Sequence, residues 1–194
     1  MSPPISSALK EWAVICRALE TGKQTLLLRK GGIAEGAGGF RAEHERFWLY
    51  PTQFHQGAEQ LRPELAPLLS EVGELQDSSG RIVIRALAEV THVEYLMSAQ
   101  QALAVSDLQG LTDEVVQQRF AYKRPGLYLF VLRIVLASEA AVVTETATMA
   151  GCKSWVQLPE AIATKNLQPV LSDGDFAHAL AEIQRRIGVS QTVR

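Results

Sequence analysis

The chain contains little cysteine and no long uninterrupted apolar run. Its two cysteines, Cys16 and Cys152, lie far apart in the sequence, and neither belongs to a CxxC pair. This excludes a disulfide framework and favours a reducing compartment, so we expect a cytoplasmic protein. The longest apolar stretch, 127–137, contains Arg133 and is too short to span a bilayer. The first residues lack a signal-peptide pattern. We therefore expect no membrane partner.

The chain also has little net charge. It carries 19 basic and 21 acidic residues, a formal net charge of -2 and a pI near 6.1. A protein covered in positive charge for nucleic-acid binding is excluded, so any such site must be a local patch. The 194 residues show no repeat, low-complexity tract or linker. This favours one globular domain over 1–194.

The pattern of apolar residues predicts an α+β fold, with a mixed or mainly antiparallel central sheet and flanking helices. Gln53 to Val72 is predicted to be helical but broken by prolines, and 140–156 is ambiguous with an extended bias. The segments 24–29 and 47–50 are expected to pair as a hairpin. Predicted helices cover 7–21, 98–105, 112–123 and 172–187, and predicted strands cover 24–29, 47–50, 81–95 and 127–136.

The stretch LLLRKGGIAEGAGGF, residues 26–40, is the first candidate site. It has neither the G-x-G-x-x-G spacing of a dinucleotide fold nor the GK[ST] ending of a Walker A loop. Arg29 and Lys30 would supply charge, and Gly31 and Gly32 would supply backbone N–H donors, which together suit a phosphate or another anion. The alternative is a hairpin loop with solvated cations.

The stretch FWLYPTQFHQ, residues 47–56, is the second candidate. His55 and Gln56 follow a strand end, where binding and catalytic groups often lie. Trp48 and Tyr50 are suited to stacking on a base or, alternatively, to filling the core. A basic group comprising Arg119, Lys123, Arg124 and Arg133 is predicted either to contact phosphates or to be a solvated helix end.

Catalysis would need a reacting group, and His55 is the candidate acid or base, with Glu35 or Glu11 as its partner. The carboxylate and lysine pattern of a metal-dependent nuclease is absent around Lys30. The spacing of Glu43, His44 and Glu45 matches no standard metal motif. We therefore predict no metal site, and the residue pattern indicates no particular cofactor.

Three stretches carry a resemblance to a bacterial family. KEWAVICRALETGKQTLLLRKGGI, FWLYPTQFHQ and GCKSWVQL span residues 10–158 and resemble the family of the domain of unknown function DUF1802. The family has no established activity. Some members are joined to a restriction-endonuclease-type domain, so the resemblance implies a link to DNA and to restriction–modification.

Three functional hypotheses follow from the sequence. The first is a binding module for nucleic acid or another phosphate-bearing ligand, in which Arg29 and Lys30 face His55 across an electropositive hollow. The second is a hydrolase or nuclease that acts on phosphodiesters. The third is a non-catalytic interaction subunit.

Overall fold

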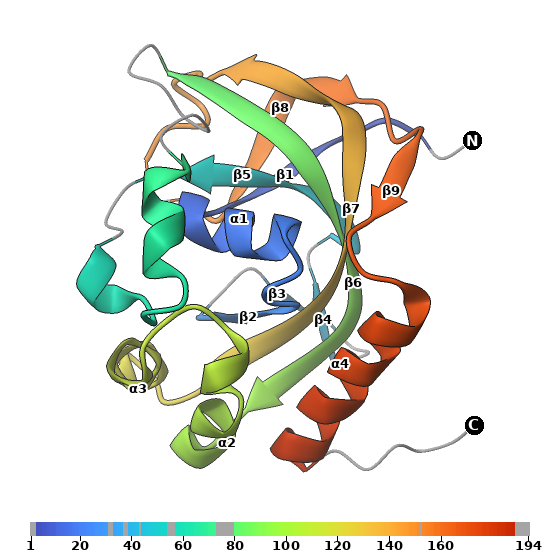
Figure 1. Ribbon diagram of the computed structural model, residues 1–194. Helices are drawn as coiled ribbons and strands as arrows, with labels where there is room; N and C mark the ends of the chain where they lie inside the picture. Colours follow the sequence, from blue (N-terminus) through green and yellow to red (C-terminus); the bar gives the residue numbers. More distant parts are fainter. Residues whose placement is uncertain are drawn as a thin grey trace.

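A strongly curved sheet forms the frame of the molecule (Figure 1). The computed structural model describes residues 3–30, 33–36, 39–42, 44–53, 57–72, 80–151 and 153–188, with the backbone alone for 33–36 and 39–42. The strand order is β2-β7-β6-β5-β1-β8, and β9 pairs with β7. The strands are β1 (Ile5–Trp12), β2 (Leu26–Arg29), β5 (Arg46–Thr52), β6 (Arg81–Leu96), β7 (Leu127–Thr144), β8 (Trp155–Ile162) and β9 (Leu167–Pro169).

All strand pairs in this sheet are antiparallel except β1 with β5. The predicted fold class, α+β with a mixed and mainly antiparallel sheet, is therefore confirmed. The long strands β6 and β7 pair from Arg81 with Thr144 to Leu96 with Leu127, with two irregularities in register. They run along the whole molecule and connect its two ends (Figure 1).

The helices lie against the curved sheet. Helix α1 lies within its curve, whereas α2, α3 and α4 gather near the end where β6 stops (Figure 1). Residues from the sheet and from all four α-helices form the main apolar core. The helices are α1 (Ala13–Glu20), α2 (Ala99–Ala104), α3 (Asp113–Ala121) and α4 (Asp173–Ile187), with 3-10 turns η1 (Ala58–Gln60), η2 (Ala66–Ser70) and η4 (Ser106–Leu108).

The predicted helix over 7–21 is wrong in its first half. Residues Ile5–Trp12 form β1, and the helix begins only at Ala13. Strand β1 lies between β5 and β8, so both of its sides are hydrogen-bonded, and Ala8 and Leu9 are buried. A strand in this position shows no simple apolar–polar alternation, and its spacing can imitate that of a helix.

The predicted hairpin between 24–29 and 47–50 is also wrong. Strand β2 pairs with β7, and β5 pairs with β1 and β6. The glycine-rich segment instead forms its own two-stranded ladder, β3 (Ile33–Gly36) with β4 (Gly39–Ala42). Pro51 does not end the second strand: it lies within β5, opposite Glu11 on the parallel neighbour β1.

Elements with strong local signals follow the sequence. The Thr112 side chain accepts a hydrogen bond from the Val115 N–H at the start of α3, and the Ser172 side chain accepts one from the Asp175 N–H at the start of α4. Helix α4 ends at Gly188, whose φ is 77°. The ambiguous region after 140 begins as a continuation of β7 to Thr144.

Candidate nucleic-acid interface

The three stretches that carry the family resemblance meet at β1. The Lys10 ammonium donates to Glu145 Oε1 at 3.2 Å and to the Gly151 carbonyl at 3.4 Å. The Tyr50 hydroxyl donates to the same Glu145 oxygen at 3.0 Å. Burial, together with this bond to Glu145, raises the pKa of the Tyr50 hydroxyl. The Lys10 side chain is only 8% exposed, so this cluster joins β1, β5 and the end of β7 in the interior.

Arg29 is held by a buried carboxylate. Its guanidinium pairs with Glu11 and donates to the Lys10 carbonyl at 3.2 Å. The side chains of Arg29 and Glu11 are only 13% and 6% exposed. A role for Arg29 in binding an anion stays a prediction, and it would require the guanidinium to leave Glu11 or to share it.

Arg119, from α3, extends this buried charge cluster. Its guanidinium lies 5.0 Å from the centre of the Trp12 ring and donates to the Leu28 carbonyl at 3.4 Å. Burial lowers the pKa of Arg119, Glu11 opposes that effect, and Arg29 adds to it. We name Arg29, Glu11 and Arg119 the β1 charge triad. Arg119 therefore interacts with groups of the protein itself, whereas Lys123 and Arg124 are exposed on the surface.

Lys30 is bound within a ring of carbonyl groups. Its ammonium donates to the carbonyls of Phe120 at 2.7 Å, of Gly126 at 2.9 Å and of Arg124. These groups belong to the end of α3 and the loop that leads into β7. Desolvation lowers the pKa of Lys30. The three carbonyls offset that penalty and fix the loop around the lysine.

A hollow of about 450 Å³ lies beside this loop. It combines three basic side chains with three tyrosines and one glycine, and we name it the Lys30 hollow. Tyr95 and Tyr128 face each other across β6 and β7, and their ring centres are 4.8 Å apart. The residues that line the hollow are Lys30, Tyr95, Tyr122, Lys123, Arg124, Gly126 and Tyr128.

The wall of the hollow depends on Gly126. This glycine has a φ of 128°, and a Cβ added to it would overlap with the Tyr95 hydroxyl. The same hydroxyl donates to the Pro125 carbonyl at 3.1 Å. Close packing of the ring on a bare backbone therefore holds the loop against β6.

We expect Gly126→Ala to lower the free energy of unfolding by about 1–3 kcal/mol, because the new methyl group must adopt a strained backbone and displace Tyr95. Urea denaturation measures this loss. Gly151→Ala is a matched control for the strain alone, since its φ is 86° but no atom lies within 4 Å of the added Cβ. Equal losses in the two variants would contradict the role given to the contact with Tyr95.

The sequence pattern identified only part of this lining. Lys30 was a predicted site residue, and Lys123 and Arg124 were predicted either to contact phosphates or to be a solvated helix end. Gly126 and the three tyrosines were not predicted. The stretch YKRPGLY, residues 122–128, held a readable signal, because aromatic and basic residues together are typical of nucleic-acid contacts. Arg133, from the same predicted basic group, instead pairs with Asp173 and lies 5.3 Å from the centre of the Phe176 ring.

The remaining predicted site residues cannot be placed at the hollow. Gly31, Gly32, His55 and Gln56 lie outside the described residues. Only the backbone of Glu35 is described, in β3 opposite Phe40. The predicted meeting of His55 with the Lys30 end of β2, and the hydrolase that depends on it, stay predictions.

The described part of the chain offers neither a metal site nor a membrane-spanning helix. It contains no group of three or more histidine, cysteine, aspartate or glutamate side chains arranged to hold a metal ion. Nor does any of its helices have the length and apolar character needed to cross a membrane.

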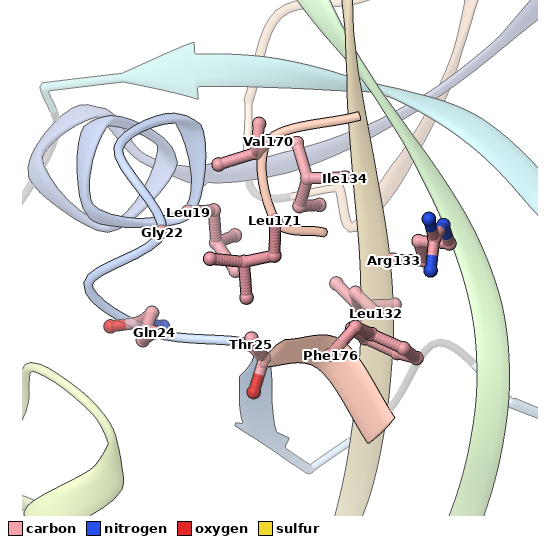
Figure 2. A pocket seen from close by; sticks show the side chains of 10 residues that line it. All are labelled: Leu19, Gly22, Gln24, Thr25, Leu132, Arg133, Ile134, Val170, Leu171 and Phe176. Atoms are coloured by element: carbon pink, nitrogen blue, oxygen red, sulfur yellow. The ribbon is translucent and has the colours of Figure 1, made fainter. Parts of the chain in front are cut away.

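A second cavity lies between α1, β7 and the segment before α4, but it has room for only about 10 Å³. Its lining is mostly apolar: Figure 2 shows Leu19, Leu132 and Leu171 around the space, while the charged end of Arg133 points away. A space of this size holds about one water molecule. The larger, charged Lys30 hollow is therefore the candidate site.

The fold of the chain is similar to that of solved ASCH proteins of Zymomonas mobilis. The crystal structure of ASCH has 12% identity and a TM-score of 0.46, covering 90% of this chain and 92% of its own. A serine-to-alanine mutant of ZmASCH has 12% identity and a TM-score of 0.47, covering 81% of this chain and 92% of its own.

Comparison of sequences gives a more direct assignment. No curated protein matches the chain. The family model for the domain of unknown function DUF1802 matches residues 8–182. The match includes most of β1, all of β5 and the segment around Gly151, where the quoted stretches meet, and it confirms the resemblance. The chain belongs to the DUF1802 family.

Proposed function

We propose that this protein binds nucleic acid at the Lys30 hollow, with Lys123 and Arg124 contacting the phosphates. The observation that carries the proposal is the gathering of basic and tyrosine side chains around one concave surface. Both cations are exposed, and they lie on a loop that Lys30 holds in place. Cations neutralise phosphates, and tyrosines offer faces on which bases stack.

The chemistry of the hollow fits the low net charge of the chain. A local basic loop can attract a polyanion even though the whole molecule is slightly acidic. Lys30 itself contributes positive charge, but its N–H groups already bind three carbonyls. Its main part in the proposal is therefore to fix the loop and raise the local potential. The link to restriction–modification stays a prediction that the family resemblance implies.

Reversing the charge of both exposed cations tests the proposal. We expect Lys123→Glu combined with Arg124→Glu to weaken binding of a labelled oligonucleotide by at least about tenfold, because two phosphate contacts become repulsive. The slope of log affinity against log salt should become shallower by about 1–2. Fluorescence anisotropy over about 50–200 mM salt measures both quantities.

The matched control is Lys23→Glu combined with Lys165→Glu, two exposed lysines that are not part of the hollow. Both double variants change the net charge by the same amount, so a general loss of attraction would affect them equally. Equal affinities for the two folded variants would contradict the proposed site. The same samples, run on a gel with Mg²⁺ or Mn²⁺, would reveal cleavage if the hydrolase hypothesis holds.

A further inference from the structure

Tyr122 combines exposure with a nearby positive charge. It is 59% exposed, so its ring is accessible to a ligand. The Lys123 ammonium lies 5.2 Å from the centre of its ring. A tyrosine ring with a cation over it, beside a second cation at Arg124, offers both a stacking face and charge. Base stacking on such a ring suits an unpaired nucleotide.

Two of the tyrosines that line the hollow come from the sheet. Tyr95 and Tyr128 come from directly paired positions on β6 and β7, and their planes are inclined at 48°. The sheet fixes both rings, whereas Tyr122 lies at the end of α3, on the connection to β7. A ligand in the hollow would therefore meet aromatic side chains from the sheet and from this connection.

The size of the hollow indicates what it can receive. About 450 Å³ lies within the range of roughly 300–1,000 Å³ that is typical of small-ligand sites. This is room for a nucleotide that leaves its stack. A duplex hides the faces of its bases and presents phosphates and base edges, so it offers nothing for Tyr122 to stack on. A duplex could use Lys123 and Arg124 but not the tyrosines.

We infer, on the basis of the proposed function, that the Lys30 hollow selects single-stranded nucleic acid over duplex. One unpaired base stacks on Tyr122, and the adjoining phosphate contacts Lys123 and Arg124. The tyrosine supplies the selectivity, because only an unpaired base presents its face. The cations supply attraction that both forms share.

The test compares single strands with a duplex of equal phosphate number. The probes are labelled single-stranded DNA, single-stranded RNA of the same sequence and the DNA duplex, at one salt concentration. We expect at least one single strand to bind about tenfold more tightly than the duplex. Tyr122→Ala should weaken single-strand binding by about five- to hundredfold and duplex binding by less than about twofold. Tyr122→Phe keeps the ring, so its affinity for single strands should fall much less than that of Tyr122→Ala.

Val142→Ala is the matched control, because Val142 is also an exposed apolar residue but lies near the far end of β7. Equal binding of duplex and single strands, or an equal effect of Tyr122→Ala on both, would overturn the inference. If charge reversal at Lys123 and Arg124 weakened the binding of single strands and duplex alike, the proposed function would still hold. If no probe binds, the proposed function fails and the inference fails with it.

Discussion

Glu11→Gln is expected to lower the free energy of unfolding by about 3–5 kcal/mol. Glu11 is the only carboxylate of the β1 charge triad, and its side chain is 6% exposed. Glutamine keeps the shape but removes the negative charge that faces Arg29 and Arg119. Two half-buried guanidinium groups that repel each other would then lack their shared carboxylate. Urea denaturation with linear extrapolation measures the loss.

Two further variants separate charge from packing in the β1 charge triad. Glu182→Gln also removes a carboxylate that binds two arginines, but on the exposed face of α4, so it should change stability very little. Glu11→Gln combined with Arg29→Gln should recover part of the loss, because one of the two cations is removed with the carboxylate. If Glu11→Gln alone were as stable as Glu182→Gln, the role assigned to Glu11 would be wrong.

Lys30→Met is expected to lower the free energy of unfolding by about 2–3 kcal/mol and to abolish most nucleic-acid binding at the hollow. Methionine preserves an apolar stem but donates no hydrogen bond. The carbonyls of Phe120, Arg124 and Gly126 would lose their common donor. The loop that carries Lys123 and Arg124 would then no longer be held beside β2. Lys30→Met would therefore reduce nucleic-acid affinity although Lys30 does not itself contact a phosphate. Denaturation and anisotropy, carried out on the same preparation, measure the two effects.

Lys153→Met provides a comparison for the Lys30 variant. The Lys153 ammonium also donates to a loop carbonyl, that of Thr148 at 2.8 Å, but beyond the opposite end of β7. We expect a smaller loss of stability and unchanged nucleic-acid affinity, because only one bond is removed and the Lys30 hollow is untouched. Hydrogen exchange of residues 120–126 should rise in the Lys30 variant alone. Unchanged exchange there, together with full binding, would show that Lys30 does not organise the hollow.

Local signals predicted several elements of the fold. The caps at Thr112 and Ser172 join groups only three residues apart, so the sequence contains all that is needed to recognise them. The long strand β6 was also predicted, because its apolar residues alternate over many positions. The expected helix over 7–21 was wrong because hydrogen bonding to β5 and β8 outweighed the local pattern of Ile5–Trp12.

The candidate site was less predictable than the elements that build it. Arg29 and Lys30 are neighbours in sequence, yet they bind different groups. Arg29 pairs with the buried Glu11 carboxylate, and Lys30 donates to three backbone carbonyls. Successive residues of a strand point to opposite faces, so adjacent cations seldom form one clamp. The partners of Lys30 lie 90 to 96 residues further along the chain. The tyrosines that line the Lys30 hollow could not be identified from their positions in the sequence.

The amino-acid sequence alone was enough to determine the α+β class, the family, the positions of the capped helices and the need for any basic site to be local. These properties depend on composition and on interactions within a few residues. Only the tertiary structure decided that β1 replaces half of a helix, that Lys10 meets Glu145 across 135 residues and that three tyrosines line the Lys30 hollow. Those contacts depend on which distant strands pair, and that choice is made by the packing of the whole core rather than by any single segment.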